Sequence, residues 1–185
     1  MWLAAAASGL GALTVYAAQP GAGAVASAWP GASRLPRPTR PTLVMMLHPE
    51  CPCSRASVAE LERLQARTSG AFDVVLLVVT RRGGDPAFLE APIARAAAAV
   101  QGARVVEDPG GVESARFGAQ TSGQAIAFDA SGAVVFRGGL TAARGHEGDN
   151  DGTDALAAIA RRAAPRTSVT PVFGCSLSTP QGDVR

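Results

Sequence analysis

The chain has 185 residues, which is enough for one ordinary domain with an appendage but too few for two full domains. Apolar residues make up 47%, which excludes a wholly disordered chain, and charged residues make up only 17%. All 17 basic residues are arginine, and a net charge of +2 gives no indication of a nucleic-acid partner. Three cysteines exclude a disulfide-rich scaffold, and their odd number leaves a thiol that is free, reactive, metal-bound or paired between chains.

The N-terminal segment, residues 1–18, is hydrophobic and carries no charged side chain. As a helix it would extend about 25 Å, at the short end for a membrane span. We expect an uncleaved transmembrane or signal-anchor helix that crosses a bacterial inner membrane once and leaves the domain facing the periplasm or the cell exterior. The alternatives are a signal peptide cleaved near Ala26-Ser27-Ala28 and a buried Ala-rich helix.

The rest of the chain divides by composition. Residues 19–41 are dense in Pro and Gly and lack hydrophobic periodicity, which is typical of a linker. We expect the ordered domain over residues 42–177 and a short tail over residues 178–185.

Within the domain, predicted strands alternate with predicted helices. A continuous apolar run indicates a buried strand at 43–47, a second buried strand is expected at 72–79 and a third, short strand at 103–106. A Gly-bearing turn at 129–132 joins strands 124–128 and 133–137 into a hairpin. Helical spacing is found at 54–67, at 86–100 with a break at Pro92, at 112–117 and at 153–163. This order predicts an α/β fold with a central mixed sheet and helices on both faces.

The candidate reactive residues lie directly after the first predicted strand, in the segment from His48 to Ser54 that contains Cys51 and Cys53. A cysteine between a strand and a helix lies near unpaired backbone N–H groups, which stabilise its thiolate. We therefore expect Cys51 to be an acidified, accessible nucleophile, and a protonated His48 to lower its pKa further. The plainer alternatives are that the two cysteines fill core space and that His48 only packs locally.

These residues resemble the thioredoxin-like superfamily, in which a strand is followed by C-x-x-C, Arg-Ala and Glu-Leu; Arg55-Ala56 and Glu60-Leu61 are in register with that pattern. The stretches HPECPCSRAS, FGAQTSG, GGLTAARGHEGDN and VFGCSL are similar to its membrane-anchored TlpA-like branch, and within it to the RedB-like group. The resemblance implies a thioredoxin-like three-layer fold and a thiol–disulfide oxidoreductase of envelope proteins, with Cys51 in the attacking position.

Two departures from that family pattern affect the site. Ser54 stands where the family has its resolving cysteine, so the motif is C-x-C-S, and Ser54 is expected to donate a hydrogen bond to the Cys51 thiolate. Gly123, in Thr121-Ser122-Gly123, stands where the family has a cis-proline. We expect Gly123 to supply an unusual trans conformation or a close backbone approach, and Thr121 and Ser122 to bind a thiolate or a ligand.

The sequence leaves the cysteine pairing open. Cys53 is the first candidate to resolve Cys51, although so small a ring is strained, and Cys175 is the second. If the chain is a redox protein, we expect no cofactor, and we expect its partners to be protein thiols and disulfides. The alternative is copper binding or delivery by His48, Cys51 and Cys53, with or without Cys175, since these are soft ligands; peroxide or thiol scavenging is a third possibility.

The glycine-rich and acidic loop 138–154 resembles a calcium loop only superficially, because the ligand spacing is not met. We expect a solvated loop leading into the last helix, which Thr153 or Asp151 would cap. Alternatively, Arg144 and His146 face the cysteines and contact substrate.

Overall fold

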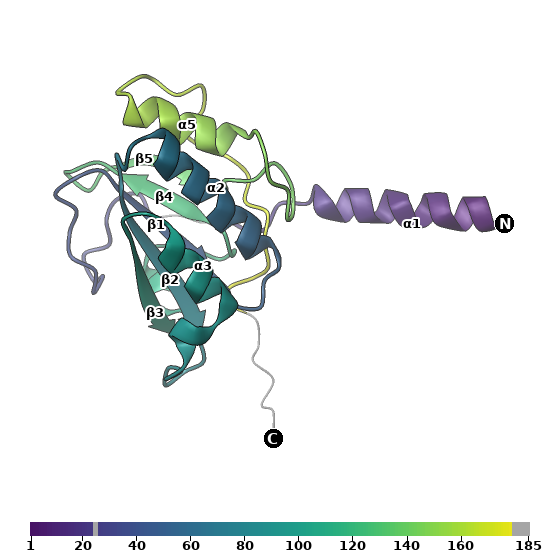
Figure 1. Ribbon diagram of the computed structural model, residues 1–185, viewed down its shortest axis with the longest axis horizontal. Helices are drawn as coiled ribbons and strands as arrows, with labels where there is room; N and C mark the ends of the chain where they lie inside the picture. Colours follow the sequence, from purple (N-terminus) through teal and green to yellow (C-terminus); the bar gives the residue numbers. More distant parts are fainter. Residues whose placement is uncertain (24–25, 179–185) are drawn as a thin grey trace.

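The computed structural model describes residues 1–23 and 26–178 (Figure 1). A hydrophobic helix, α1 (Trp2–Ala17), precedes a domain in which strands and helices alternate. The strands are β1 (Thr42–Leu47), β2 (Asp73–Thr80), β3 (Ala103–Pro109), β4 (Ala125–Phe128) and β5 (Val134–Gly138). The helices of the domain are α2 (Cys53–Arg67), α3 (Pro92–Ala99), α4 (Val112–Arg116) and α5 (Asp151–Ala160), with a short 3-10 helix, η1 (Phe88–Glu90), before α3.

The strands form one mixed sheet in the order β3-β2-β1-β4-β5. β1, β2 and β3 are parallel to one another, whereas β4 and β5 are antiparallel additions on the other side of β1. β1 is central, and all of its residues are buried, as expected of a strand covered on both faces. The predicted α/β fold with a central mixed sheet is confirmed, including the hairpin between β4 and β5.

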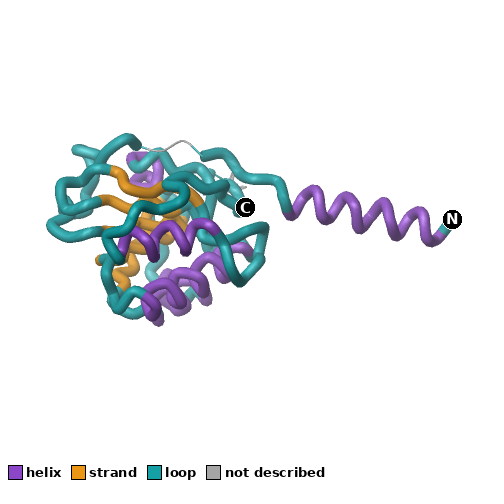
Figure 2. The backbone as a smooth tube through the Cα atoms, turned by 90° about the horizontal axis from the view of Figure 1, so that it is seen from above, coloured by secondary structure: helices purple, strands orange, loops and turns teal. Residues whose placement is uncertain are grey.

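The two faces of the sheet are covered differently (Figure 2). On one face α2, α3 and α5 pack together, and they bury Leu61, Leu64 and Leu156 completely. On the other face α4 and the chain before β1 surround Phe117 and Phe128. The sheet therefore has a hydrophobic core on each side, which makes the three layers of the fold.

The segment predicted as a linker packs against the second of these faces. Trp29 and Leu35 are buried there, and the Trp29 ring lies 5.1 Å from the ring centre of Phe117 and 4.9 Å from that of Phe128. The backbone N–H of Trp29 also donates to the Gly132 carbonyl oxygen at 2.9 Å. Residues 26–41 are thus part of the domain rather than a free linker. Apart from Ser178, the predicted tail lies outside the described residues.

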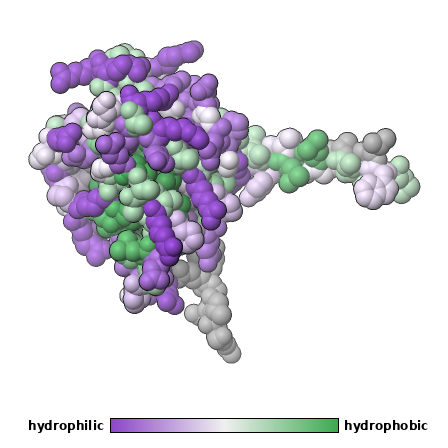
Figure 3. Space-filling model, viewed as in Figure 1, coloured by the Kyte–Doolittle hydropathy of each residue, from purple (hydrophilic) through white to green (hydrophobic). Residues whose placement is uncertain are grey.

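The N-terminal helix extends away from the domain and exposes apolar side chains such as Leu10, Leu13 and Val15 (Figure 3). It forms where the sequence predicts, but its 16 residues correspond to about 24 Å, against roughly 30 Å of membrane hydrocarbon. Across the described residues, we find no helix with both the length and the apolar character that crossing a bilayer requires.

One predicted helix boundary is confirmed and another is wrong. Pro92 does break the predicted helix, so that a 3-10 helix precedes it and α3 begins at it. The cap of α5 is Asn150, whose Oδ1 accepts a hydrogen bond from the Thr153 N–H at 2.8 Å, and not Thr153 or Asp151.

Candidate active site

Cys51 lies in the tight turn between the end of β1 and the start of α2. The Cys51 N–H donates to the His48 carbonyl oxygen at 3.2 Å, and the Ser54 N–H donates to the Cys51 carbonyl oxygen at 3.0 Å. Within this turn the backbone amide of Cys53 also acts to lower the pKa of Cys51. The amides that open α2 therefore face Cys51, as its position in the sequence predicts.

The Cys51 sulfur is covered by the C-terminal segment of the chain. The backbone N–H of Cys175 donates to Cys51 Sγ at 3.3 Å, which places Cys175 directly beside the sulfur. Cys51 is only 3% exposed, whereas Cys53 and Cys175 are half-buried. The expectation that Cys51 is accessible is therefore wrong, because a segment far along the chain lies over it.

Main-chain hydrogen bonds hold this covering segment, residues 172–177, in place. The Ser122 N–H donates to the Cys175 carbonyl oxygen at 2.8 Å, and the Leu177 N–H donates to the Gln120 carbonyl oxygen at 2.9 Å. Thr121 and Ser176 form an antiparallel bridge between these two bonds. The approach is so close at Gly174 that a Cβ there would overlap the Ser122 carbonyl oxygen.

The three cysteines are free thiols with different acidities. Burial acts to raise the pKa of Cys51, but hydrogen bonds from Cys175, Ser54 and the Cys53 amide together bring it below its ordinary value. Burial and the neighbouring Cys51 raise the pKa of Cys53, and they raise that of Cys175 to about 11. Cys51 is therefore the first of the three to ionise.

His48 packs locally and supplies no positive charge. It is buried, and burial lowers its pKa, against which the carboxylate of Glu50 acts only in part. Its Nδ1 accepts a hydrogen bond from the Glu50 N–H at 3.2 Å. The acidity of Cys51 comes from its hydrogen bonds and not from an imidazolium, which corrects the role expected for His48.

Ser54 and the loop 121–123 form a buried hydroxyl network beneath the thiols. Ser122 Oγ accepts from the His48 N–H at 2.8 Å and shares a hydrogen bond of 2.7 Å with Ser54 Oγ. The Thr121 hydroxyl donates to the Ala22 carbonyl oxygen at 2.7 Å. Both side chains of the loop are thus engaged within the protein, where the sequence suggested contact with a ligand.

Gly123 takes the unusual trans conformation that the sequence predicts. Its φ is +87°, and no cis peptide bond occurs among the described residues. A Cβ at this position would lie 2.6 Å from Ser57 Oγ, so the backbone of the loop comes directly against α2.

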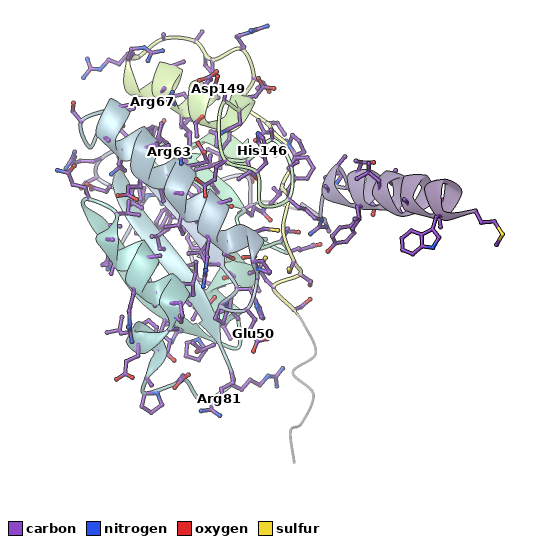
Figure 4. The ribbon with its side chains drawn as sticks, turned by 45° about the vertical axis from the view of Figure 1, so that its right-hand side comes forward. Glu50, Arg63, Arg67, Arg81, His146 and Asp149 are labelled. Atoms are coloured by element: carbon purple, nitrogen blue, oxygen red, sulfur yellow. The ribbon has the colours of Figure 1, made fainter. Side chains whose placement is uncertain are left out.

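Of the two residues proposed in the loop before α5, Arg144 lies beside the thiols. Its Nη1 donates to the Gly174 carbonyl oxygen, and the charge of Arg144 and the amide of the next residue, Gly145, both act to lower the pKa of Cys53, against burial and Cys51, which raise it. His146 is exposed and lies well away from Glu50 at the start of α2 (Figure 4). In the described part of the chain no hydrogen bond joins His146 to a cysteine.

Sequence reasoning missed the part played by the end of α1. The Arg144 guanidinium lies over the Tyr16 ring, 4.8 Å from its centre, and the Arg144 N–H donates to the Ala17 carbonyl oxygen at 3.1 Å. A single aromatic residue at the end of an apolar helix carries no signal for such a contact.

The soft donors considered for copper do not converge. His48 directs Nδ1 at a backbone amide, and no group of three His, Cys, Asp or Glu side chains in the described ranges is placed to hold a metal ion. The donors at this site therefore do not fit a preformed copper centre.

Comparisons with known proteins bear on the fold. A scan against protein-family models and a search of curated proteins gave no match. Among solved structures, a hypothetical protein from Sinorhizobium meliloti matches with a TM-score of 0.63 at 17% identity, over 89% of this chain and 100% of that one. An uncharacterized conserved protein from Geobacillus kaustophilus matches with a TM-score of 0.61 at 16% identity, over 89% and 93%.

A secreted disulfide oxidoreductase of Mycobacterium tuberculosis matches less closely, with a TM-score of 0.49 at 16% identity, over 68% of this chain and 84% of that one. Sequence identities this low show a similarity of fold alone. Three parallel strands followed by an antiparallel hairpin, with a cysteine turn between the central strand and the first helix of the domain, are the arrangement that the sequence resemblance implies. The chain has the thioredoxin-like fold.

Proposed function

We propose that this chain is a thiol–disulfide redox protein in which Cys51 is the nucleophile and Cys175 is its resolving partner. The observation that carries the proposal is the hydrogen bond of 3.3 Å from the Cys175 N–H to Cys51 Sγ, and the Cys175 side chain also acts to lower the pKa of Cys51. Cys53 also adjoins Cys51, but a disulfide between them would close a small, strained ring. The preference for Cys175 over Cys53 reverses the order expected from the sequence.

The reaction proceeds in two exchange steps. The Cys51 thiolate attacks one sulfur of a substrate disulfide, forms a mixed disulfide and releases the first substrate thiolate. The Cys175 thiolate then attacks Cys51 Sγ, forms the Cys51–Cys175 disulfide and releases the second substrate thiolate. The substrate gains two electrons and two protons, and the protein loses them; the reverse sequence oxidises a substrate dithiol.

Access to Cys51 requires the 172–177 segment to move, because the thiol is 3% exposed. Protein substrates of the cell envelope, engaged through the C-x-C-S motif, are the substrate class that we propose. We further propose that the exposed apolar side chains of α1 attach the domain to the outer surface of a bacterial inner membrane, facing the periplasm. Extraction of membrane fractions with alkaline carbonate, on the full chain and on a variant without residues 2–17, tests that attachment.

Differential alkylation with mass spectrometry tests the redox proposal. We expect the oxidised wild type to give a peptide pair linked between Cys51 and Cys175, and the Cys51→Ser variant to give no internal disulfide. The linked pair should form in Cys53→Ser and be absent from Cys175→Ser. A wild type that forms no internal disulfide at any glutathione ratio, or that retains stoichiometric copper under reducing conditions, contradicts the proposal and favours metal delivery.

A further inference from the structure

Arg144 is a cation without an anionic partner at the thiol cluster. Among the residues that the structure describes, no carboxylate is within ion-pairing distance of its guanidinium, and its Nε is buried without a hydrogen-bond partner. Arg144 is half-buried, and a partly buried charge that lacks a counterion is stabilised by an anion that forms beside it during function.

Residues 144–145 lie near both half-buried thiols, those of Cys53 and Cys175. Arg144 Nη1 donates to the Gly174 carbonyl oxygen, which belongs to the peptide unit leading into Cys175. Burial and Cys51 raise the pKa of Cys53, and Arg144 and the Gly145 amide both act to lower it. On the far side, the Tyr16 ring and the Ala17 carbonyl oxygen hold Arg144 from α1, so the guanidinium is fixed from two directions.

We propose that Arg144 is a positioning residue that supplies the positive charge for the thiolate of the resolving cysteine, chiefly Cys175. This inference rests on the proposed function, since it concerns the second of the two exchange steps. In that step Cys175 Sγ loses its proton to solvent and forms a bond to Cys51 Sγ. The bond between Cys51 and the substrate sulfur breaks, and its electron pair leaves on the substrate thiolate.

The electrostatics of the mixed disulfide support this role. In the reduced protein, burial opposes ionisation of Cys175, and Cys51 adds to that opposition both as a hydrogen-bond partner and as a charge, whereas Arg144 favours ionisation. When Cys51 is bonded to substrate it is no longer a thiolate, so its negative charge and its acceptance of a hydrogen bond from the Cys175 thiol no longer oppose that ionisation. Arg144 then remains as the charge that favours the Cys175 thiolate.

A stopped-flow experiment isolates the step. Reduced protein in the Cys53→Ser background is mixed with excess aromatic disulfide whose released thiolate absorbs visible light. The first phase of release reports attack by Cys51, and the second reports attack by Cys175. We expect Arg144→Gln to move the pH midpoint of the second phase upward and to slow that phase by roughly threefold or more near neutral pH. Arg144→Lys should restore the midpoint, and Arg137→Gln, which removes an exposed arginine from β5, should leave it unchanged.

The outcomes separate the two proposals. If Arg144→Gln leaves the midpoint unchanged, or slows the second phase equally at every pH, Arg144 only holds the Gly174 segment and the inference is overturned. If the unsubstituted background has no second phase, and Cys175→Ser makes no difference, the proposed pairing itself fails. The first phase serves as the folding control, because it requires an intact turn at Cys51.

Discussion

The backbone N–H of Cys175 and the sulfur of Cys51 are joined by a hydrogen bond across 124 positions of the sequence. This bond, with the thiol–thiol contact beside it, makes Cys175 the strongest influence that lowers the pKa of Cys51. The residue that covers the nucleophile is thus also the residue that activates it.

The first prediction follows from this pairing. Cys175→Ala removes the thiol hydrogen bond but keeps the backbone N–H, so we expect the pKa of Cys51 to rise. Titration by the ultraviolet absorbance of thiolates measures the shift without requiring access to the buried sulfur. Conversely, Cys51→Ser should bring the pKa of Cys175 down from about 11, because Cys51 is among the groups that raise it. An unchanged pKa of Cys51 in Cys175→Ala would contradict the conclusion that Cys175 lowers it.

His48 gives a second prediction, on acid stability. Its pKa is lowered in the folded protein, so below the ordinary histidine pKa the unfolded chain binds a proton that the folded chain does not. The free energy of unfolding should therefore fall as pH drops from the ordinary histidine pKa toward the lowered folded value. His48→Gln should remove that part of the pH dependence, and the exposed His146→Gln should not.

The same His48→Gln variant tests the origin of the thiol acidity. Because His48 is not among the main groups that shift the pKa of Cys51, the ultraviolet titration of that thiol should match wild type. A clear upward shift would restore the imidazolium role that the sequence suggested.

A third prediction concerns the segment before β1. Trp29→Ala should lower the free energy of unfolding by about 3 kcal/mol, because it empties a site between two buried phenylalanine rings. Trp2→Ala, in the exposed part of α1, is the matched control and should have almost no effect. Denaturant unfolding measures both, and equal stabilities would mean that residues 26–41 do not contribute to the core.

Gly174→Ala provides the fourth prediction. The added Cβ would overlap the main-chain oxygen of Ser122, which cannot rotate away, so the 172–177 segment must move outward. We expect a lower yield of the Cys51–Cys175 disulfide and, at pH values above the Cys51 pKa, faster alkylation of Cys51. Gly31→Ala, where a Cβ meets nothing within 4 Å, should behave as wild type. An unchanged disulfide yield would show that the close approach at Gly174 does not hold Cys175.

The sequence predicts the sheet well because the central strands β1 and β2 are almost entirely apolar and because proline and glycine mark where elements end. Pro92 and the Gly-bearing turn before β5 end elements for steric reasons that act within a few residues. The position of Cys51 at the start of a helix is predictable for the same reason, since it depends only on the adjacent strand and helix.

What the sequence could not predict depends on contacts between distant segments. The burial of Cys51 is decided by Cys175, and the neutrality of His48 by how deeply its turn is covered. Trp29 is a buried residue in a segment whose Pro and Gly content is typical of a linker, so its burial could not be predicted. The position of Arg144 depends on Tyr16 and Gly174, which come from opposite ends of the chain.

The hydrogen bonds of the 172–177 segment also have a consequence for biosynthesis. Every strand of the sheet, and the loop on which the segment lies, is translated before Cys175 emerges. A nascent chain can therefore complete its sheet while Cys51 is still uncovered and lacks its strongest activating contact. During that interval the Cys51 thiol is open to oxidants but less acidic. Once the last part of the domain is made and packs over it, the thiol becomes buried and its pKa falls.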